Sequence, residues 1–241
     1  RSLYNAALDG LSLEGNRFFY GNPLASSGQH YRRDWFGTAC CPPNISRLVA
    51  SVGDYIYAKS EDALWVNLFI GSKTKFQIGK VDVPMEMTTN YPLDGVIHLT
   101  LNPEQKARFS VKLRLPGWAK EEPVPGGLYR FAGKSTEKFT LLLNSKVVPY
   151  SEENGYLTIT RTWEKGDQLQ YSVPMEVRKL VARQEVTANE DRIAIQRGPL
   201  VYCVEGADNN GKAWNLLISE NATFTVFQHQ VLDEKVMAVQ A

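Results

Sequence analysis

Strong net charge, abundant cysteine and long apolar runs are all missing from this 241-residue sequence. It has 27 lysine and arginine residues against 26 acidic ones, and the net charge of +1 gives no electrostatic reason to expect nucleic-acid binding. No apolar stretch approaches the roughly 20 residues that a membrane-spanning helix needs, so no membrane partner is expected. The three cysteines are an odd, sparse set, which excludes a disulfide-stabilised scaffold.

Two of these cysteines, Cys40 and Cys41, are adjacent and are followed by Pro42 and Pro43. Apolar residues then recur at helical spacing, which predicts a short amphipathic helix, at Ile45, Leu48, Val49 and Val52. Prolines suit its first turn, because no N–H is needed there. A thiol just ahead of a helix N-terminus has a lowered pKa and can act as a nucleophile or a metal ligand. The residues alone equally allow two small, buried apolar side chains.

Period-two alternation replaces the helical pattern after about residue 55. It is clearest where Phe109, Val111 and Leu113 alternate with polar residues, as in a half-buried antiparallel strand. Further strands are expected at 54–58, 63–70, 75–81, 85–90, 95–101, 139–143, 146–148, 155–161 and 168–173. Many short strands without helices between them predict a β-sandwich or jelly roll. The Pro- and Gly-rich residues 121–138 are interpreted as an inserted surface loop.

Four segments resemble one known family in their order along the chain: Arg17–Leu24, Trp35–Asn44, Leu113–Trp118 and Ile195–Tyr202. That family was once called domain of unknown function 1680 and now forms glycoside hydrolase families 127 and 146. The run Cys-Cys-Pro-Pro-Asn is its most specific feature here. Because the type activity is β-L-arabinofuranosidase, the resemblance implies a retaining glycoside hydrolase acting on L-arabinose-containing glycans. A bacterial cytoplasm or periplasm is the expected compartment, with no signal peptide visible from Arg1.

The resemblance also implies a mainly β architecture. In this family an (α/α)6-barrel catalytic domain precedes jelly-roll-like β-sandwich domains, and this chain resembles only the C-terminal part. We therefore expect a barrel remnant at 1–56, a β-sandwich domain at 57–176 and a second, incomplete β-sandwich at 177–241. The remnant is expected either to be disordered or to use its exposed apolar faces in a homo-oligomer or domain swap through 1–56.

The family's centre is similar to a zinc thiolate site held by one Glu and three Cys, with a separate Glu as acid/base. By position, Cys40 resembles the nucleophile and a zinc ligand, Cys41 resembles a second zinc ligand, and Tyr20 resembles a tyrosine near the sugar pocket. Thr38 stands where members often carry another Cys. The remaining ligands and the acid/base lie upstream in the family. Because tetrahedral zinc needs four ligands, we expect this chain alone to be inactive, with zinc absent or incompletely coordinated.

Two functions of other classes remain open. A carbohydrate-binding or structural β-sandwich module would be favoured by a row of exposed aromatics on one sheet, and opposed by burial of Trp65, Trp118 and Trp163. A cysteine-based zinc protein of unrelated function lacks a second ligand pair at suitable spacing. Cys203, within an apolar strand, is expected in the core. His30 is expected to be a solvated loop residue, with sugar binding as the alternative.

Overall fold

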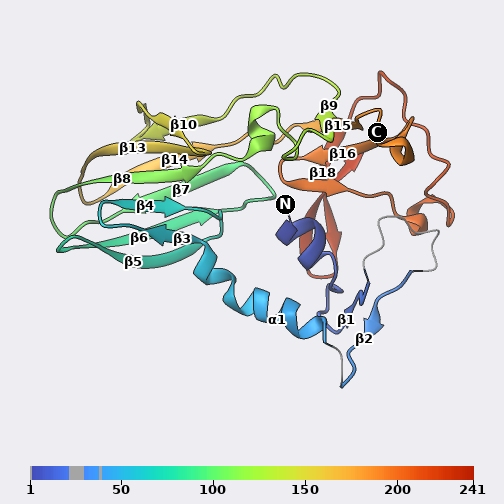
Figure 1. The fold of residues 1–241 in the computed structure, drawn as a ribbon, viewed down its shortest axis with the longest axis horizontal. Coiled ribbons are helices and arrows are strands. Elements are labelled where there is room, and N and C mark those ends of the chain that lie inside the picture. Colours follow the sequence, from blue (N-terminus) through green and yellow to red (C-terminus); the bar gives the residue numbers. More distant parts are fainter. Residues whose placement is uncertain (1, 22–29, 38–39) are drawn as a thin grey trace. The chain divides into compact units, whose positions relative to one another are not determined.

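The computed structural model describes residues 2–21, 30–37 and 40–241 (Figure 1). The chain divides into two compact units. The sandwich unit comprises residues 52–193, and the cysteine unit comprises 1–51 and 194–241. As expected, the fold is mainly β, and α1 (Pro42–Ser51) is the one α-helix of the described residues. None of the helices in these residues is long and apolar enough to cross a membrane.

Two large sheets, of six and five strands, build most of the sandwich unit. The first contains, in spatial order, β11 (Lys146–Val147), β10 (Thr140–Leu143), β14 (Asp167–Ser172), β7 (Val96–Leu101), β6 (Val81–Thr89) and β5 (Ser72–Ile78). The second contains β12 (Ser151–Glu153), β13 (Tyr156–Trp163), β8 (Ala107–Arg114), β4 (Ala63–Val66) and β3 (Tyr57–Lys59). Neighbouring strands are antiparallel except for the parallel pair β4 and β8.

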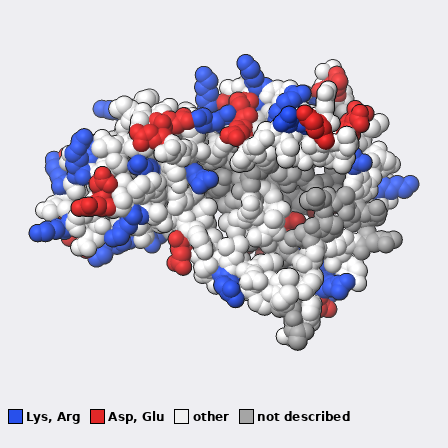
Figure 2. Space-filling model, in the orientation of Figure 1, with Lys and Arg blue, Asp and Glu red and all other residues white. Residues whose placement is uncertain are grey.

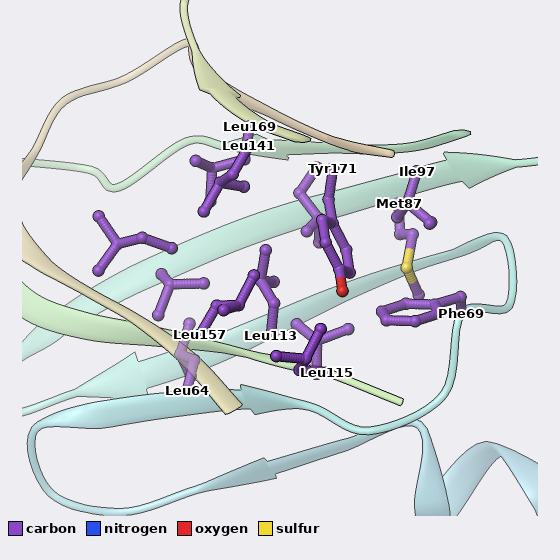
Figure 3. Packing of buried hydrophobic residues seen from close by; sticks show 14 of the residues in the cluster. Leu64, Phe69, Met87, Ile97, Leu113, Leu115, Leu141, Leu157, Leu169 and Tyr171 are labelled. Atoms are coloured by element: carbon purple, nitrogen blue, oxygen red, sulfur yellow. The ribbon is translucent and has the colours of Figure 1, made fainter. Parts of the chain in front are cut away.

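The core of this unit lies between the sheets, into which both send apolar side chains (Figure 3). Alternation along β8 buries Phe109, Val111 and Leu113, as the sequence predicted. Trp163 is fully buried, and its Nε1 donates a 3.0 Å hydrogen bond to the Phe109 carbonyl. Trp118 is also buried, at 8% exposed. Both residues therefore belong to the core.

Three predicted strands are wrong in their boundaries. The strand predicted at 63–70 ends at Val66, and Asp54 and Tyr55, predicted to begin a strand, lie in a 3-10 turn. The third is 75–81. β5 ends at Ile78, and β6 begins at Val81, the residue opposite it in the ladder. Gly79 makes the turn between them with a φ of +58°, a conformation that glycine adopts without strain. The apolar alternation continues on both sides of this two-residue turn, so the pattern alone did not separate the two strands.

The interpretation of 121–138 as a simple surface loop also needs correction. Within it β9 (Tyr129–Phe131) pairs antiparallel with β15 (Val177–Ala182), and Phe131 is only 8% exposed. A three-residue strand inside a segment rich in glycine, proline and lysine is too short to give a visible alternation. The segment is therefore part of the packed structure.

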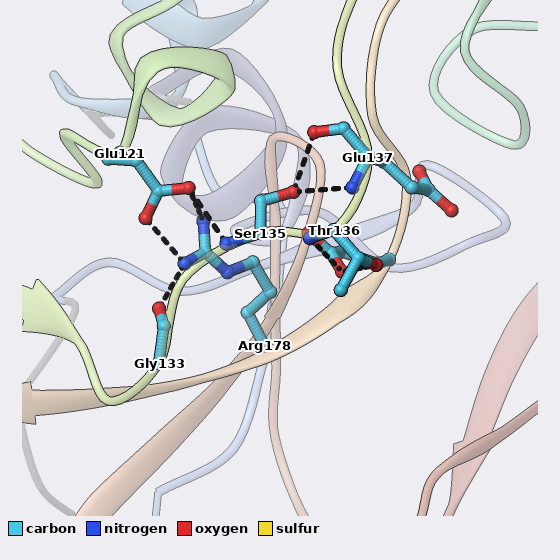
Figure 4. Close-up of polar contacts among 7 residues, drawn as sticks. Glu121, Gly133, Ser135, Thr136, Glu137 and Arg178 are labelled. Atoms are coloured by element: carbon cyan, nitrogen blue, oxygen red, sulfur yellow. Dashed lines mark hydrogen bonds and ion pairs between the residues drawn. The ribbon is translucent and has the colours of Figure 1, made fainter.

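A polar cluster fixes the rest of this segment (Figure 4). Arg178 on β15 donates to the two carboxylate oxygens of Glu121 at 3.1 and 2.7 Å, and also to the Gly133 carbonyl. Its guanidinium lies 3.6 Å from the centroid of the Phe131 ring. The hydrogen bond from Arg178 is the main reason that the pKa of Glu121 falls below its ordinary value. Arg178 thus holds Glu121, at the start of the inserted segment, and Gly133, within it, against one strand.

The cysteine unit is built from short elements. They are a π-helix (Leu3–Leu8), the hairpin of β1 (Arg17–Phe18) and β2 (Arg33–Asp34), α1, the pair β16 (Ile193–Arg197) and β17 (Leu200–Tyr202), and the hairpin of β18 (Thr225–Val231) and β19 (Glu234–Gln240). A 3-10 turn of this unit lies at Gly206–Asn209, whereas those at Val52–Tyr55, Gly117–Lys120 and Thr187–Asn189 belong to the sandwich unit. Asn5 joins the first helix to β17, because its amide accepts from Val201 N and donates to the Pro199 carbonyl, both at 2.8 Å.

The prediction that Cys203 packs in the core is wrong. β17 ends at Tyr202, and Cys203 follows it as an exposed, free thiol. Because the strand ends at Tyr202, Cys203 lies outside the sheet.

Candidate active site

The two adjacent cysteines stand directly before the start of α1 at Pro42, as their sequence context predicts. Asn44, in the first turn of this helix, hydrogen-bonds to the backbone of both cysteines. Its side-chain amide donates to the Cys40 carbonyl at 3.1 Å, and its backbone N–H donates to the Cys41 carbonyl at 3.0 Å. The backbone that presents the thiols is therefore tied to the helix start.

Tyr20 reaches the same place from the chain just after β1. Its Oη lies 3.2 Å from the Sγ of Cys40, and the Sγ atoms of Cys40 and Cys41 are 3.5 Å apart. Tyr20, Cys40 and Cys41 are all exposed. The structure thus brings together the three residues that the resemblance singled out, while their roles stay predictions.

The tyrosine changes the acidity of the neighbouring thiol. Its hydrogen bond is the largest cause that lowers the pKa of Cys40, followed by the hydrogen bond with Cys41. The same bond to Cys40 is the first cause that raises the pKa of Tyr20 to about 12. The phenol therefore keeps its proton, and its O–H donates a hydrogen bond to the Cys40 sulfur. This hydrogen bond favours the thiolate form of Cys40. This stabilisation of Cys40 by Tyr20 was not found by sequence reasoning, which assigned the tyrosine to the sugar pocket.

An aromatic cluster surrounds this corner of the molecule. The fully buried Phe18 packs against the rings of Trp35 at 5.1 Å, Phe36 at 5.9 Å and Tyr20 at 6.3 Å between centroids. The last three rings remain partly open, with exposures of 38%, 47% and 46%. Sequence reasoning missed Trp35 and Phe36, although they stand in the motif that carries the cysteines. Exposed ring faces suit the C–H groups of a sugar.

The thiols fit only part of a zinc site. A tetrahedral zinc centre takes four ligands, and the sulfurs of Cys40 and Cys41 are close enough to supply two of them. Across residues 2–21, 30–37 and 40–241, no group of three or more His, Cys, Asp and Glu side chains could hold a metal ion. Thr38, predicted to replace a further cysteine of the family, lies outside the described residues.

The remaining aromatic and histidine candidates are mostly involved in packing. His30 is half-buried and stacks on Phe19 at 4.4 Å, so it is not the solvated loop residue that was expected. Trp65 is half-buried, with the Lys112 ammonium 5.1 Å from its ring centroid. Since Trp118 and Trp163 lie in the core, the tryptophans of the sandwich unit give no support to a sugar-binding module.

Figure 2 shows positive and negative side chains interspersed over the visible face, without a large patch of one sign. This distribution agrees with the near-zero net charge and does not favour a polyanionic partner on that face.

Comparison with known proteins identifies the family. The model of the GH127 β-L-arabinofuranosidase catalytic domain matches residues 1–54, that of the GH127 middle domain matches 63–175, and that of the glycoside hydrolase family 127 C-terminal domain matches 177–238. The non-reducing end β-L-arabinofuranosidase of Bifidobacterium longum subsp. longum is 33% identical over 238 residues, which cover 92% of this chain and 33% of that protein.

Solved structures agree with this assignment. The GH127 β-arabinofuranosidase BT3674 matches with a TM-score of 0.92 and 36% identity, over 99% of this chain and 37% of that one. Ara127N, a GH127 β-L-arabinofuranosidase from Geobacillus stearothermophilus T6, matches with a TM-score of 0.85 and 35% identity, over the same shares. The chain thus spans about a third of the length of these relatives. It belongs to glycoside hydrolase family 127, of which it carries the tail of the catalytic domain, the middle domain and the C-terminal domain.

Proposed function

We propose that this chain is part of a retaining glycoside hydrolase that releases L-arabinofuranose from L-arabinose-containing glycans. The observation that carries the proposal is the contact between Tyr20 and the Cys40–Cys41 pair. It lies in the segment matched by the catalytic-domain family model, and the relatives are named for β-L-arabinofuranosidase activity.

Cys40 is the proposed nucleophile. Its thiolate attacks the anomeric carbon, a C–S bond forms and the glycosidic C–O bond breaks, while a carboxylic acid on the opposite face protonates the leaving oxygen. Water, deprotonated by the resulting carboxylate, then attacks the same carbon and releases the Cys40 thiolate. Two displacements at one carbon retain its configuration.

Tyr20 supports both displacements through its hydrogen bond to the Cys40 sulfur. The bond favours the thiolate before attack, and it favours the same thiolate again when sulfur leaves the sugar. Asn44 holds the Cys40 carbonyl and thereby limits how far the nucleophile can move. The exposed ring of Phe36, next to Tyr20 at 5.9 Å, offers a face for the sugar C–H groups.

Cys40 and Cys41 would hold two positions of a zinc site in the larger protein. When bound there, zinc supplies Lewis-acid stabilisation of thiolate sulfur. By the resemblance, the other ligands and the acid/base carboxyl come from the preceding part of the catalytic domain. We therefore infer that residues 1–241 alone do not turn over substrate.

A chimera tests this proposal, with residues 1–241 replacing the matching third of the Bifidobacterium longum relative. We expect hydrolysis of an aryl β-L-arabinofuranoside by the chimera and none by the chain alone, with or without zinc. Cys40→Ser should abolish turnover in the chimera, whereas Cys203→Ser, which removes the other exposed thiol of the chain, should preserve it. Turnover by the chain alone would refute its inactivity, and an active Cys40→Ser chimera would refute the assignment of the nucleophile.

A further inference from the structure

We propose that Cys40 and Cys41 form a chelating, covalent binding site for trivalent organoarsenicals. Both thiols are free and exposed, and their sulfurs lie 3.5 Å apart. Such an arsenical takes two thiolate sulfurs at once when the pair is close and accessible. The site requires neither a sugar nor the rest of the catalytic domain, so it stands independently of the proposed glycosidase activity.

The separation of the sulfurs suits one bridging atom. Two bonds of about 2.3 Å, the length of a zinc–thiolate bond, span at most about 4.6 Å, so a separation of 3.5 Å leaves a bent bridge of roughly 100°. A pyramidal arsenic atom, which forms sulfur bonds of similar length, adopts such a bent arrangement. The Asn44 contacts to both cysteine carbonyls hold the backbone in place, so little ordering is needed when the second bond forms.

The reaction with phenylarsine oxide balances without an oxidant or a reductant. Two As–S bonds form, the arsenic–oxygen double bond breaks, and the oxygen leaves as water with the two thiol protons. Arsenic stays trivalent, and each sulfur stays at its original oxidation level. The Cys40 sulfur lies beside the exposed ring of Tyr20, which itself neighbours the exposed ring of Phe36, so apolar ring surface is available close to the pair for the phenyl group.

Chelation distinguishes this pair from the third thiol. After the first As–S bond forms, the second is intramolecular, which raises apparent affinity by about 100-fold or more. Cys203 is also free and exposed, but it stands alone after β17. A single As–S bond at Cys203 exchanges with any excess of a monothiol, whereas the ring across Cys40 and Cys41 resists it.

The test is intact-mass measurement of the 241-residue chain after phenylarsine oxide, in excess 2-mercaptoethanol. We expect one adduct per chain, which persists in the monothiol and is removed by 2,3-dimercaptopropanol. Cys203→Ser should keep this adduct, and Cys40→Ser and Cys41→Ser should each weaken it at least about 100-fold. Circular dichroism and iodoacetamide labelling of the remaining thiols confirm that each variant is folded and reduced.

An adduct of equal affinity in Cys40→Ser or Cys41→Ser would overturn the proposal, as would the absence of a persistent adduct on the unmodified chain. Failure of Cys40 or Cys41 to react with iodoacetamide on the unmodified chain, located by peptide mass mapping, would also overturn it, because the pair would then not be free. None of these measurements depends on sugar turnover, so failure here leaves the chimera assay to decide the glycosidase proposal separately.

Discussion

The sandwich unit and the cysteine unit differ in how they treat their apolar side chains. In the sandwich unit the inward residues of facing sheets are completely covered, as at Leu99, Val111 and Leu157. Among the described residues of the cysteine unit, Phe18 is the one large apolar side chain with no exposure. In the same unit Leu13 and Tyr31 are each 69% exposed.

Within one chain, then, the large buried core and the candidate active-site residues lie in different units. The sandwich unit has a core that is complete within the described residues, whereas the cysteine unit presents free, exposed thiols beside partly exposed aromatic rings. Large exposed apolar areas of this kind commonly bind another polypeptide. The exposure agrees with the expectation for residues 1–56, and a second copy or a domain swap through them stays a prediction. A sedimentation experiment would test it.

The largest expected effect breaks the core of the sandwich unit. Trp163→Ala removes a fully buried indole and leaves the Phe109 carbonyl without its donor, so we expect a loss of about 3–5 kcal/mol in the free energy of unfolding. Urea denaturation measures it. Trp65→Ala, at a half-buried position of the same unit, is the matched control and should cost less. If both variants lost the same free energy of unfolding, the greater burial of Trp163 would not contribute to stability.

The sandwich could be predicted because its information is local. Alternation in residues such as Phe109, Val111 and Leu113 fixes which face of a strand is buried, and Asn144-Ser145 fixes a tight turn, with a positive φ at both residues. What could not be predicted is non-local. The parallel pairing of β4 with β8 joins segments about forty residues apart, and β9 becomes a strand only because β15 lies beside it.

The candidate site also combines local features, which could be predicted from the sequence, with non-local contacts, which could not. The position of the cysteines before a helix follows from the prolines and the apolar spacing that come after them. The contact of Tyr20 with Cys40 joins residues twenty positions apart across a hairpin, and no local pattern encodes it. Only the resemblance pointed to Tyr20, and it suggested contact with the sugar, not with the thiol. Cys203 was misplaced because an apolar run does not show where a strand ends.

The second prediction tests the cohesion of the cysteine unit. Asn5→Ala removes two hydrogen bonds of 2.8 Å to the backbone around β17 and leaves the Pro199 carbonyl and Val201 N–H without these partners. We expect a local loss of about 1–3 kcal/mol, seen as faster hydrogen exchange at Val201. Asn16→Ala, at an exposed turn, should change the free energy of exchange at Val201 by less than about 0.5 kcal/mol. Unchanged protection in Asn5→Ala would mean that the contact does not join these segments.

The third prediction returns to the sandwich unit and depends on pH. The folded-state pKa of Glu121 is lowered, so its ion pair with Arg178 stabilises the fold above the ordinary value of 4.5, and this stabilisation is lost as pH falls through the folded pKa. Glu121→Gln should therefore lower the free energy of unfolding, measured by urea denaturation near neutral pH, by about 1 kcal/mol or less, because the carboxylate is partly exposed.

Below the folded pKa of Glu121 the difference between variant and parent should shrink. Lys146→Gln, at an exposed position on β11, is the control for removing one surface charge and should show no such convergence. A gap that widens on acidification would contradict the assignment of the pKa shift to the Arg178 contact.

The smallest expected effect concerns reactivity instead of folding. Tyr20→Phe removes the donor that most lowers the pKa of Cys40, so a smaller fraction of this thiol is ionised near neutral pH. We expect slower alkylation of Cys40 by iodoacetamide in Tyr20→Phe, because the thiolate is the nucleophile. Peptide mass mapping in chelator-treated buffer follows the rate. Tyr31→Phe, which alters a more exposed phenol, should leave the rate unchanged. If Tyr20→Phe also left it unchanged, the thiol would owe its ionisation to the start of α1, and the cysteine unit would need no contact across its hairpin to activate Cys40.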